Sequence, residues 1–498
     1  MARNRGRIKV PKGSHGKDEP TMDDRPFDLP GKRLSAEFLQ TAVELQYLVS
    51  AYGIDNTPRQ PKTRAEFEAF YVKVHDGWKE AQRRIAKLLT ERLSVRAEAL
   101  AMERQARQSR DPEARKSAVQ MMATVAIEIA FLRRTLDVVL WTILQGEHST
   151  LRRLVVKGGQ HSLSARNISD AMRAAEHLNR SPLVMALATD MLSLVHVGDL
   201  VHIDRGAGQV SFVELKAGEK NNEMAMLAEA SLQIKCEHFD QFATAEMVDI
   251  DKKHFERVKR QAQRNHTIIE TIRNEGGTDP NTGGKVLIHP TGEPTELWSK
   301  AIVSCYEQLS DQKNWAIQEI DDCLYLGVYN DLKHAFVGFQ AWMHSIKCRS
   351  RIFNLTDCFR NPGVRPLGAM DLPLPLKEQI LRGDIVVIMC LDIARMIELA
   401  NRIQPGYMRL ATRKETARMR QTLPHNDFAL DRLLVRAGGE TGPHTYLAEG
   451  FRDRILFDQH RPAQLLAQNI RGEAHLRKTL EREGALAKDS SDPATYGP

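Results

Sequence analysis

The hydrophobic pattern changes character once along the chain, and this change limits the possible folds more than any other feature. Between residues 34 and 145 the apolar side chains recur at the spacing of amphipathic α-helices. After Gly146 two short strand-like runs, residues 199–204 and 209–216, enclose a turn-forming Arg-Gly-Ala-Gly segment. The sequence therefore predicts an all-helical N-terminal domain followed by an α/β core.

The length of 498 residues is too great for one small core, and the composition, with 42% hydrophobic and 27% charged residues, is that of a folded protein. Residues 118–144 are the most apolar helical segment and are expected to be buried, whereas residues 92–115 are expected to form an exposed helix. We expect five segments: a basic disordered tail (1–33), a helical domain (34–145), an α/β core (146–292), a mixed α/β C-terminal region (293–480) and a disordered tail (481–498).

The charge and cysteine content restrict the partners and the compartment. Lys plus Arg exceed Asp plus Glu by 71 to 64, and the net charge of +7 favours a polyanionic partner. The first 17 residues are basic, which fits either a phosphate-binding tail or a solvated leader without a role. The six cysteines lack C-x-x-C spacing, so neither a zinc ribbon nor a disulfide framework is expected, and a reducing cytoplasm fits best. No membrane span or signal peptide is predicted.

Three polar residues at the ends of the two strand-like runs carry the chemical signal. Asp199 begins the first run, and Glu214 and Lys216 end the second. Because residues i and i+2 of a strand point to one face, Glu214 and Lys216 should lie side by side, and a hairpin should bring Asp199 to the same end. Carboxylates bind the hard divalent cation that phosphodiester cleavage needs, and Lys216 is suited to position or deprotonate the attacking water. An ordinary hairpin with a surface ion pair is the alternative.

In Gly198-Asp199 and Glu214-Leu215-Lys216 the chain resembles the PD-(D/E)XK nuclease superfamily, the restriction-endonuclease-like enzymes. The resemblance covers residues 146–290. It implies a restriction-endonuclease-like α/β core, a mixed sheet flanked by helices, with Mg²⁺ or Mn²⁺ bound by Asp199 and Glu214 and with Lys216 as a catalytic residue. Gly198 stands where the proline of the family name often stands, a common replacement in that family.

The resemblance also implies two further site residues. An acidic residue often lies on the helix before the sheet, for which Glu176 is the candidate and Asp190 the alternative; a glutamine often lies on the helix after it, for which Gln261 is the candidate. Basic residues surround Gln261, and they form either a phosphate-binding face or a merely solvated one. The residues expected to bind nucleic acid are Arg257, Arg260, Arg264 and Lys220.

Two other features of the sequence are weaker candidates. A second acidic-x-Lys triplet begins at Asp251, but it lacks a preceding strand-turn-strand and is discounted. The strand predicted at residues 384–390 follows Gly383 and repeats the Gly-Asp pair of the site, but no Glu-x-Lys follows it, so we interpret it as a core strand of the C-terminal region.

The sequence thus predicts a Mg²⁺-dependent endonuclease that acts on DNA ahead of RNA, in defence against foreign DNA or in DNA repair. The C-terminal region is expected to recognise substrate or to form a homodimer. The alternative is a non-catalytic module that keeps the nuclease-like sheet as a scaffold to bind nucleic acid or protein. The two acidic residues together with Lys216 favour the enzyme, and metal-dependent cleavage separates the two hypotheses.

Overall fold

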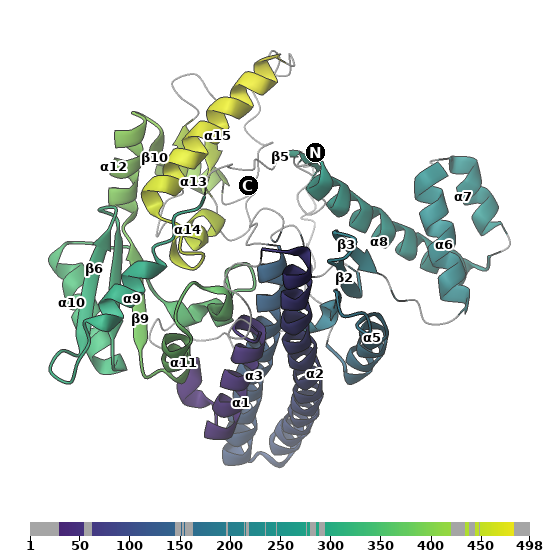
Figure 1. Ribbon diagram of the computed structural model, residues 1–498, viewed down its shortest axis with the longest axis horizontal. Helices are drawn as coiled ribbons and strands as arrows, with labels where there is room; N and C mark the ends of the chain where they lie inside the picture. Colours follow the sequence, from purple (N-terminus) through teal and green to yellow (C-terminus); the bar gives the residue numbers. More distant parts are fainter. Residues whose placement is uncertain are drawn as a thin grey trace, which may run out of the picture.

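The computed structural model of the chain is a mixed α/β protein in which a long helical hairpin lies between two small sheets (Figure 1). All strand pairs that it describes are antiparallel. The structure describes residues 29–53, 62–144, 151, 154, 163–195, 198–213, 215, 219–234, 236–245, 247–274, 276–278, 285–287, 294–419, 434–437, 444–447 and 449–482.

The helices and strands follow one another in three groups. The first contains η1 (Pro30–Arg33), α1 (Ala36–Ser50), α2 (Arg64–Ser109) and α3 (Pro112–Ile143). The second contains α5 (Ala165–Leu178), β1 (Val184–Ala188), η2 (Thr189–Met191), β2 (Leu200–Asp204), β3 (Gln209–Val213), α6 (Glu219–Ile234), α7 (Glu237–Thr244), α8 (Asp249–Arg273), β4 (Gly276–Thr278) and β5 (Lys285–Leu287).

The third group begins with α9 (Ser299–Glu307), β6 (Trp315–Ile320), β7 (Leu324–Tyr329), α10 (Leu332–Ser345), β8 (Ile352–Asn354), η3 (Leu355–Phe359), η4 (Leu367–Ala369), α11 (Leu374–Arg382), β9 (Val386–Leu391) and α12 (Ile393–Ile403). It ends with β10 (Met408–Leu410), α13 (Arg413–Met419), β11 (Leu434–Ala437), β12 (His444–Tyr446), α14 (Glu449–Leu456) and α15 (Pro462–Arg482). Among the described helices, none is both long and apolar enough to cross a bilayer.

The hairpin of α2 and α3 has clear sequence signals at its start and at the turn between the two helices. Helix α2 begins with a capping box: the Thr63 hydroxyl accepts the Glu66 N–H, and the Glu66 carboxylate accepts the Thr63 N–H. It ends at Arg110, which adopts the left-handed conformation, and Asp111 caps α3 directly afterwards. The predicted exposed helix 92–115 is therefore wrong at its C-terminal end, because the turn between two helices lies inside it.

Helix α3 joins the two sheets through a buried ion pair. Arg134 Nη1 lies 2.8 Å from Asp137 Oδ2, and both side chains are almost fully buried. Asp137 Oδ1 accepts the backbone N–H of Ser193, in the loop after β1, at 2.9 Å. Arg134 donates to three backbone carbonyl oxygens of the C-terminal region, those of Cys358, Pro362 and Val364. One hydrophobic cluster accordingly contains side chains from the helical hairpin and from both sheets, so the three central predicted segments share a core.

The first sheet has the order β1-β2-β3, and β2 is its central strand. Side-chain amides close the outer edge of β1: the buried Gln82 bonds to Ala186 O and Ala188 N at 3.0 Å each, and the half-buried Asn179 bonds to both backbone polar groups of Ala186. The other edge is β3, where Val210 is 48% exposed. The hairpin predicted for residues 199–216 is thus confirmed for the part described.

The second sheet has the order β6-β7-β9-β8, and its two central strands, β7 and β9, are buried on both faces. Alternate residues of β9 belong to different clusters: Val387 and Met389 to the main cluster, Ile388 and Cys390 to a second cluster with α10. This explains the continuous apolar run that predicts a core strand at residues 384–390, a prediction that β9 confirms. Gly327 on β7 is required because a Cβ there would lie 2.8 Å from the Phe339 ring of α10.

Helices α6, α7 and α8 form an arm that extends from the body of the molecule (Figure 1). Its small core contains Ala228, Phe255 and Val258. At the other end of the chain, the predicted disordered tail 1–33 is wrong for its last residues: η1 is ordered, and Leu29 is buried in the cluster beneath α10.

Candidate functional site

Asp199 is fixed by backbone hydrogen bonds on both sides at the start of β2. Its N–H donates to Val213 O, at the end of β3, at 2.9 Å, and its carbonyl oxygen accepts the Thr189 N–H at 2.9 Å. The Thr189 hydroxyl also donates to Gly198 O at 2.6 Å. Gly198 has a φ of +67°, which an L side chain rarely adopts, and this turn sets the direction in which β2 begins. The position of the Asp199 backbone is therefore determined by β3 and by η2.

The Asp199 carboxylate points to the chain that follows β3. Its Oδ2 accepts the backbone N–H of Leu215 at 2.6 Å, and the residue is half-buried. Val213 and Leu215, the two sequence neighbours of Glu214, are thus both hydrogen-bonded to Asp199. Glu214 and Lys216 themselves lie outside the described residues, as does the Lys220 side chain. The structure brings the predicted aspartate to the segment where the sequence predicts the other two residues.

Of the two metal ligands that the sequence predicts, Asp199 lies within the described residues and Glu214 does not. Those residues contain no group of three or more His, Cys, Asp or Glu side chains that could hold a metal ion. Asp199 supplies one carboxylate of the hard oxygen type that Mg²⁺ prefers. A metal at this position therefore depends on Glu214 as the second ligand, as the sequence predicts.

The two candidates for the helix acid lie in different surroundings. Glu176 is exposed on α5, beside a buried face that includes Met172 and Ala175, and it stays a prediction. Asp190 lies in η2, next to the Thr189 that fixes Asp199. Burial lowers the pKa of the neighbouring Arg133, while the charges of Asp137 and Asp190 act against that shift. Asp190 thus acts electrostatically on the buried guanidinium of Arg133.

A polar stripe on α8 runs from the arm toward the body of the protein. Arg257, Gln261, Arg264 and Ile268 follow one another at four-, three- and four-residue spacing, which places them on one helix face. Arg257 and Gln261 are exposed, Arg264 is half-buried, and Ile268 is fully buried in the main cluster, to which Phe212 of β3 also packs. Ile268 therefore joins one end of the stripe to the main core, whereas Arg257 and Gln261 are open to solvent.

The remaining candidates on α8 also have defined positions. Arg260 is exposed beside the stripe, and its Nε donates to Glu256 O at 3.2 Å. Asp251, which begins the second acidic-x-Lys triplet, lies in the first turn of α8. On a helix, residues i and i+2 point in different directions, so this triplet does not place its acid and its lysine side by side. Its rejection on sequence grounds is consistent with this helical position.

Comparison of the chain with protein-family models, curated proteins and solved structures gave no match. The site is therefore assigned from its residues and their geometry. Sequence reasoning missed Thr189, whose backbone and hydroxyl fix Asp199 and Gly198. A threonine nine residues before Gly198 carries no sequence signal of this role, because the contact depends on how η2 returns to the start of β2.

Proposed function

We propose that the protein is a metal-dependent nuclease that hydrolyses phosphodiester bonds, with DNA as the preferred substrate over RNA. The observation that carries the proposal is a pair of hydrogen bonds: the Asp199 N–H donates to Val213 O, and the Asp199 carboxylate accepts the Leu215 N–H. These bonds hold Asp199 at the end of the sheet, in contact with the two sequence neighbours of Glu214. Lys216 follows Glu214 by two residues in the sequence. The order of a helix, three antiparallel strands and a further helix around it is compatible with the general α/β class that the sequence predicts.

The proposed chemistry divides among three residues. Asp199 and Glu214 would hold Mg²⁺ or Mn²⁺, which supplies charge neutralisation on the phosphate and a lower pKa for the attacking water. Lys216 positions that water or stabilises the negative charge that develops on the phosphate oxygens. The Leu215 N–H keeps the Asp199 carboxylate in one orientation, so that less reorganisation is needed when the cation binds.

The stripe on α8 supports a nucleic acid as the substrate. Arg257 and Arg264 share one face of α8, and Arg260 lies beside them. Guanidinium groups bind phosphates through paired N–H donors, and such contacts make binding strongly dependent on salt. The net charge of +7 acts in the same direction. A role in defence against foreign DNA or in DNA repair would follow from a DNA substrate.

The test is cleavage of plasmid, linear and single-stranded DNA and of RNA by the full chain, with Mg²⁺, Mn²⁺ or EDTA. Asp199→Asn is the sharpest variant, because an amide oxygen can still accept the Leu215 N–H while the charge is removed. We expect this variant, Glu214→Ala and Lys216→Ala each to lose at least about 100-fold in cleavage rate. EDTA should abolish cleavage by the parent protein.

Two control variants make the same aspartate-to-asparagine change in similar sequence motifs that lie outside the candidate site. Asp384→Asn changes the other Gly-Asp pair of the chain, and Asp251→Asn changes another of its acidic-x-Lys triplets. Both should cleave at the parent rate. If the parent binds nucleic acid but cleaves none of the substrates with any metal, the non-catalytic binding module replaces the nuclease as the best hypothesis. Equal loss of activity in the controls would also count against the assigned site.

A further inference from the structure

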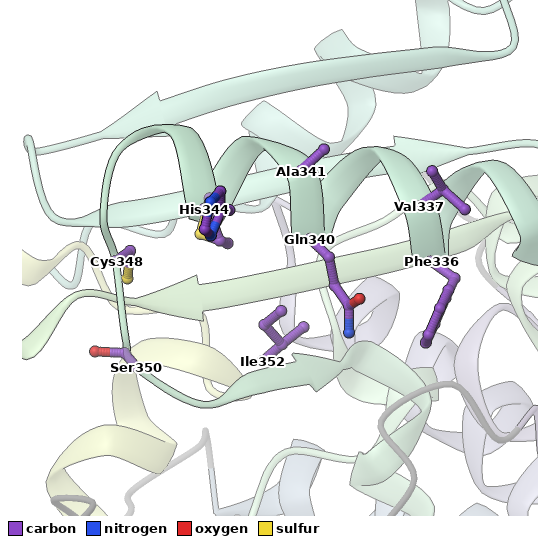
Figure 2. Close-up of a pocket in the computed structure, with 9 residues that line it drawn as sticks. Phe336, Val337, Gln340, Ala341, His344, Cys348, Ser350 and Ile352 are labelled. Atoms are coloured by element: carbon purple, nitrogen blue, oxygen red, sulfur yellow. The ribbon is translucent and has the colours of Figure 1, made fainter.

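Two cysteines that are far apart in the sequence meet beside a shallow groove on the second sheet. The Sγ atoms of Cys348, which follows α10, and Cys390, on β9, are 3.6 Å apart. Cys348 and Ser350 lie at one end of the groove, whose other lining residues include Phe336, Gln340 and His344 (Figure 2). Cys348 is half-buried and Cys390 is buried, so a small reagent in the groove reaches the first before the second.

The surroundings of the pair make the two sulfur atoms chemically different. The Cys390 thiol and the backbone and hydroxyl groups of Ser350 form hydrogen bonds that lower the pKa of Cys348, against the effects of burial and of the Asp392 charge. The Ser350 Oγ accepts the Ile393 N–H at 3.1 Å, which leaves its hydroxyl hydrogen for the Cys348 sulfur. The hydrogen bond with Cys348 and burial raise the pKa of Cys390. Cys348 is therefore the more acidic and the more accessible of the two thiols.

The other described cysteines lack this combination. Burial raises the pKa of Cys305 to about 11 and that of Cys358 to about 12, and it also raises the pKa of Cys323. These three thiols are buried, whereas Cys236 is half-buried, on the arm. Reactive cysteines combine exposure with stabilisation of the thiolate, and buried neutral thiols are inert. Cys236 is thus the matched control for exposure.

We propose that Cys348 and Cys390 are a redox-active pair that forms a reversible disulfide when the protein meets a hydroperoxide. The Cys348 thiolate attacks the outer oxygen of the O–O bond, which gives a Cys348 sulfenic acid and releases hydroxide or an alkoxide. The Cys390 sulfur then attacks the Cys348 sulfur; its proton leaves with the sulfenic hydroxyl as water, and the S–S bond forms. The sulfur atoms must approach from 3.6 Å to about 2.05 Å.

The disulfide would tie the segment after α10 to the central part of the second sheet. Cys390 pairs with Ile352 of β8 and Tyr325 of β7, and Cys348 N donates to Met343 O at the end of α10. The link would thus fix the end of the groove formed by Cys348 and Ser350. This inference is independent of the nuclease proposal, because the pair lies on the other sheet.

The test treats the full chain with hydrogen peroxide, blocks the remaining thiols by alkylation and maps the cysteines by peptide mass spectrometry. We expect a peptide linked through Cys348 and Cys390 that dithiothreitol separates, formed at least about 10-fold faster than oxidation of Cys236. Cys236→Ser should form the same link. Cys390→Ser should accumulate a Cys348 sulfenic acid that dimedone traps.

Two outcomes would overturn the proposal. One is the absence of the linked peptide in the parent protein at peroxide concentrations that oxidise Cys236. The other is oxidation of Cys390 at the parent rate in Cys348→Ser, because Cys348 would then not be the group that reacts first. The parent measurement decides the matter even if a serine at the buried position destabilises the fold.

Discussion

The two sheets each contain a strand that begins after a Gly-Asp pair, and the two pairs have different environments. Gly198 and Gly383 both have positive φ, at +67° and +73°. Asp199 is half-buried and accepts the Leu215 N–H, next to the end of the neighbouring strand. Asp384 is instead exposed, and it forms an ion pair with Lys32 of η1 at 2.8 Å.

This difference shows that a Gly-Asp pair alone predicts a turn that leads into a strand. It does not by itself predict a functional site. The glycine is needed because the chain reverses direction with a left-handed residue. What the aspartate then contacts depends on the element that lies beside it. For Asp199 this is the end of β3, which leads into Glu214 and Lys216, and for Asp384 it is an N-terminal segment that brings a lysine.

The largest expected effect is on the ion pair that connects the two regions. Asp137→Ala leaves Arg134 buried without its anionic partner and also removes the acceptor of the Ser193 N–H. We expect the free energy of unfolding to fall by about 3–5 kcal/mol. Urea unfolding followed by circular dichroism measures it. The double variant Arg134→Met, Asp137→Leu should recover part of the loss, and equal stability of the parent and Asp137→Ala would show that the two sheets are not joined here.

Acid should weaken the region of the first sheet through His75 of α2. His75 Nδ1 lies 3.2 Å from Pro182 O, before β1, and burial lowers its pKa to about 4, with smaller effects of Lys79 and Arg205. The unfolded chain, with an ordinary histidine pKa of about 6.5, binds the proton more readily. The contribution of the neutral His75 to the free energy of unfolding is therefore complete above pH 6.5 and is lost as the pH falls toward 4. At 1.36 kcal/mol per pKa unit, the loss is up to about 3 kcal/mol.

The measurement is urea unfolding between pH 4 and 7 for the parent and for His75→Gln, in which an amide N–H can still donate to Pro182 O. The difference in unfolding free energy between the two proteins should shrink as the pH falls. A constant difference over this range would exclude His75 as the titrating group.

Alanine at the two glycines compares the two Gly-Asp pairs directly. Each change should cost about 1–2 kcal/mol, because a left-handed L residue is strained. At Gly198 the added Cβ lies 3.3 Å from Val213 O and from Phe212 Cβ, so it presses on β3 itself. At Gly383 it lies 3.2 Å from Cδ1 of the buried Leu29 and 3.2 Å from Cε of the flexible Lys32, both in the segment around η1. Gly198→Ala should therefore also lower cleavage, by about 10-fold or more, and Gly383→Ala should not. Loss of cleavage in both would indicate a global effect.

The smallest effect is expected for the exposed ion pair of the second Gly-Asp site. Asp384→Asn removes the contact with Lys32, and both side chains are more than half exposed. Such pairs contribute less than about 1 kcal/mol, and salt screens them. Thermal unfolding should show a small decrease at low salt that vanishes at high salt. A large decrease that salt does not change would mean that this aspartate anchors η1 in a way that an exposed ion pair does not explain.

Much of the local structure follows from the sequence, because local signals are read over a few residues. The buried helix predicted at residues 118–144 is confirmed by α3, except for its last residue, Leu144, which is the C-cap. The turn between α2 and α3 also has a local signal, because an aspartate followed by a proline, here Asp111 and Pro112, is typical of the start of a helix. The predicted mixed core sheet is wrong for the strands described, which pair antiparallel, since pairing direction depends on distant partners.

The sequence by itself determined the helical and strand segments and the residue types of the candidate site, because periodicity and motif spacing are local properties. The tertiary structure decided which side chains meet. It brought Thr189 and Leu215 into hydrogen-bond contact with Asp199, buried Ile268 of α8 in the main core and brought Cys348 within 3.6 Å of Cys390. These contacts join residues that are separated along the chain, and packing rather than spacing sets the distance between them.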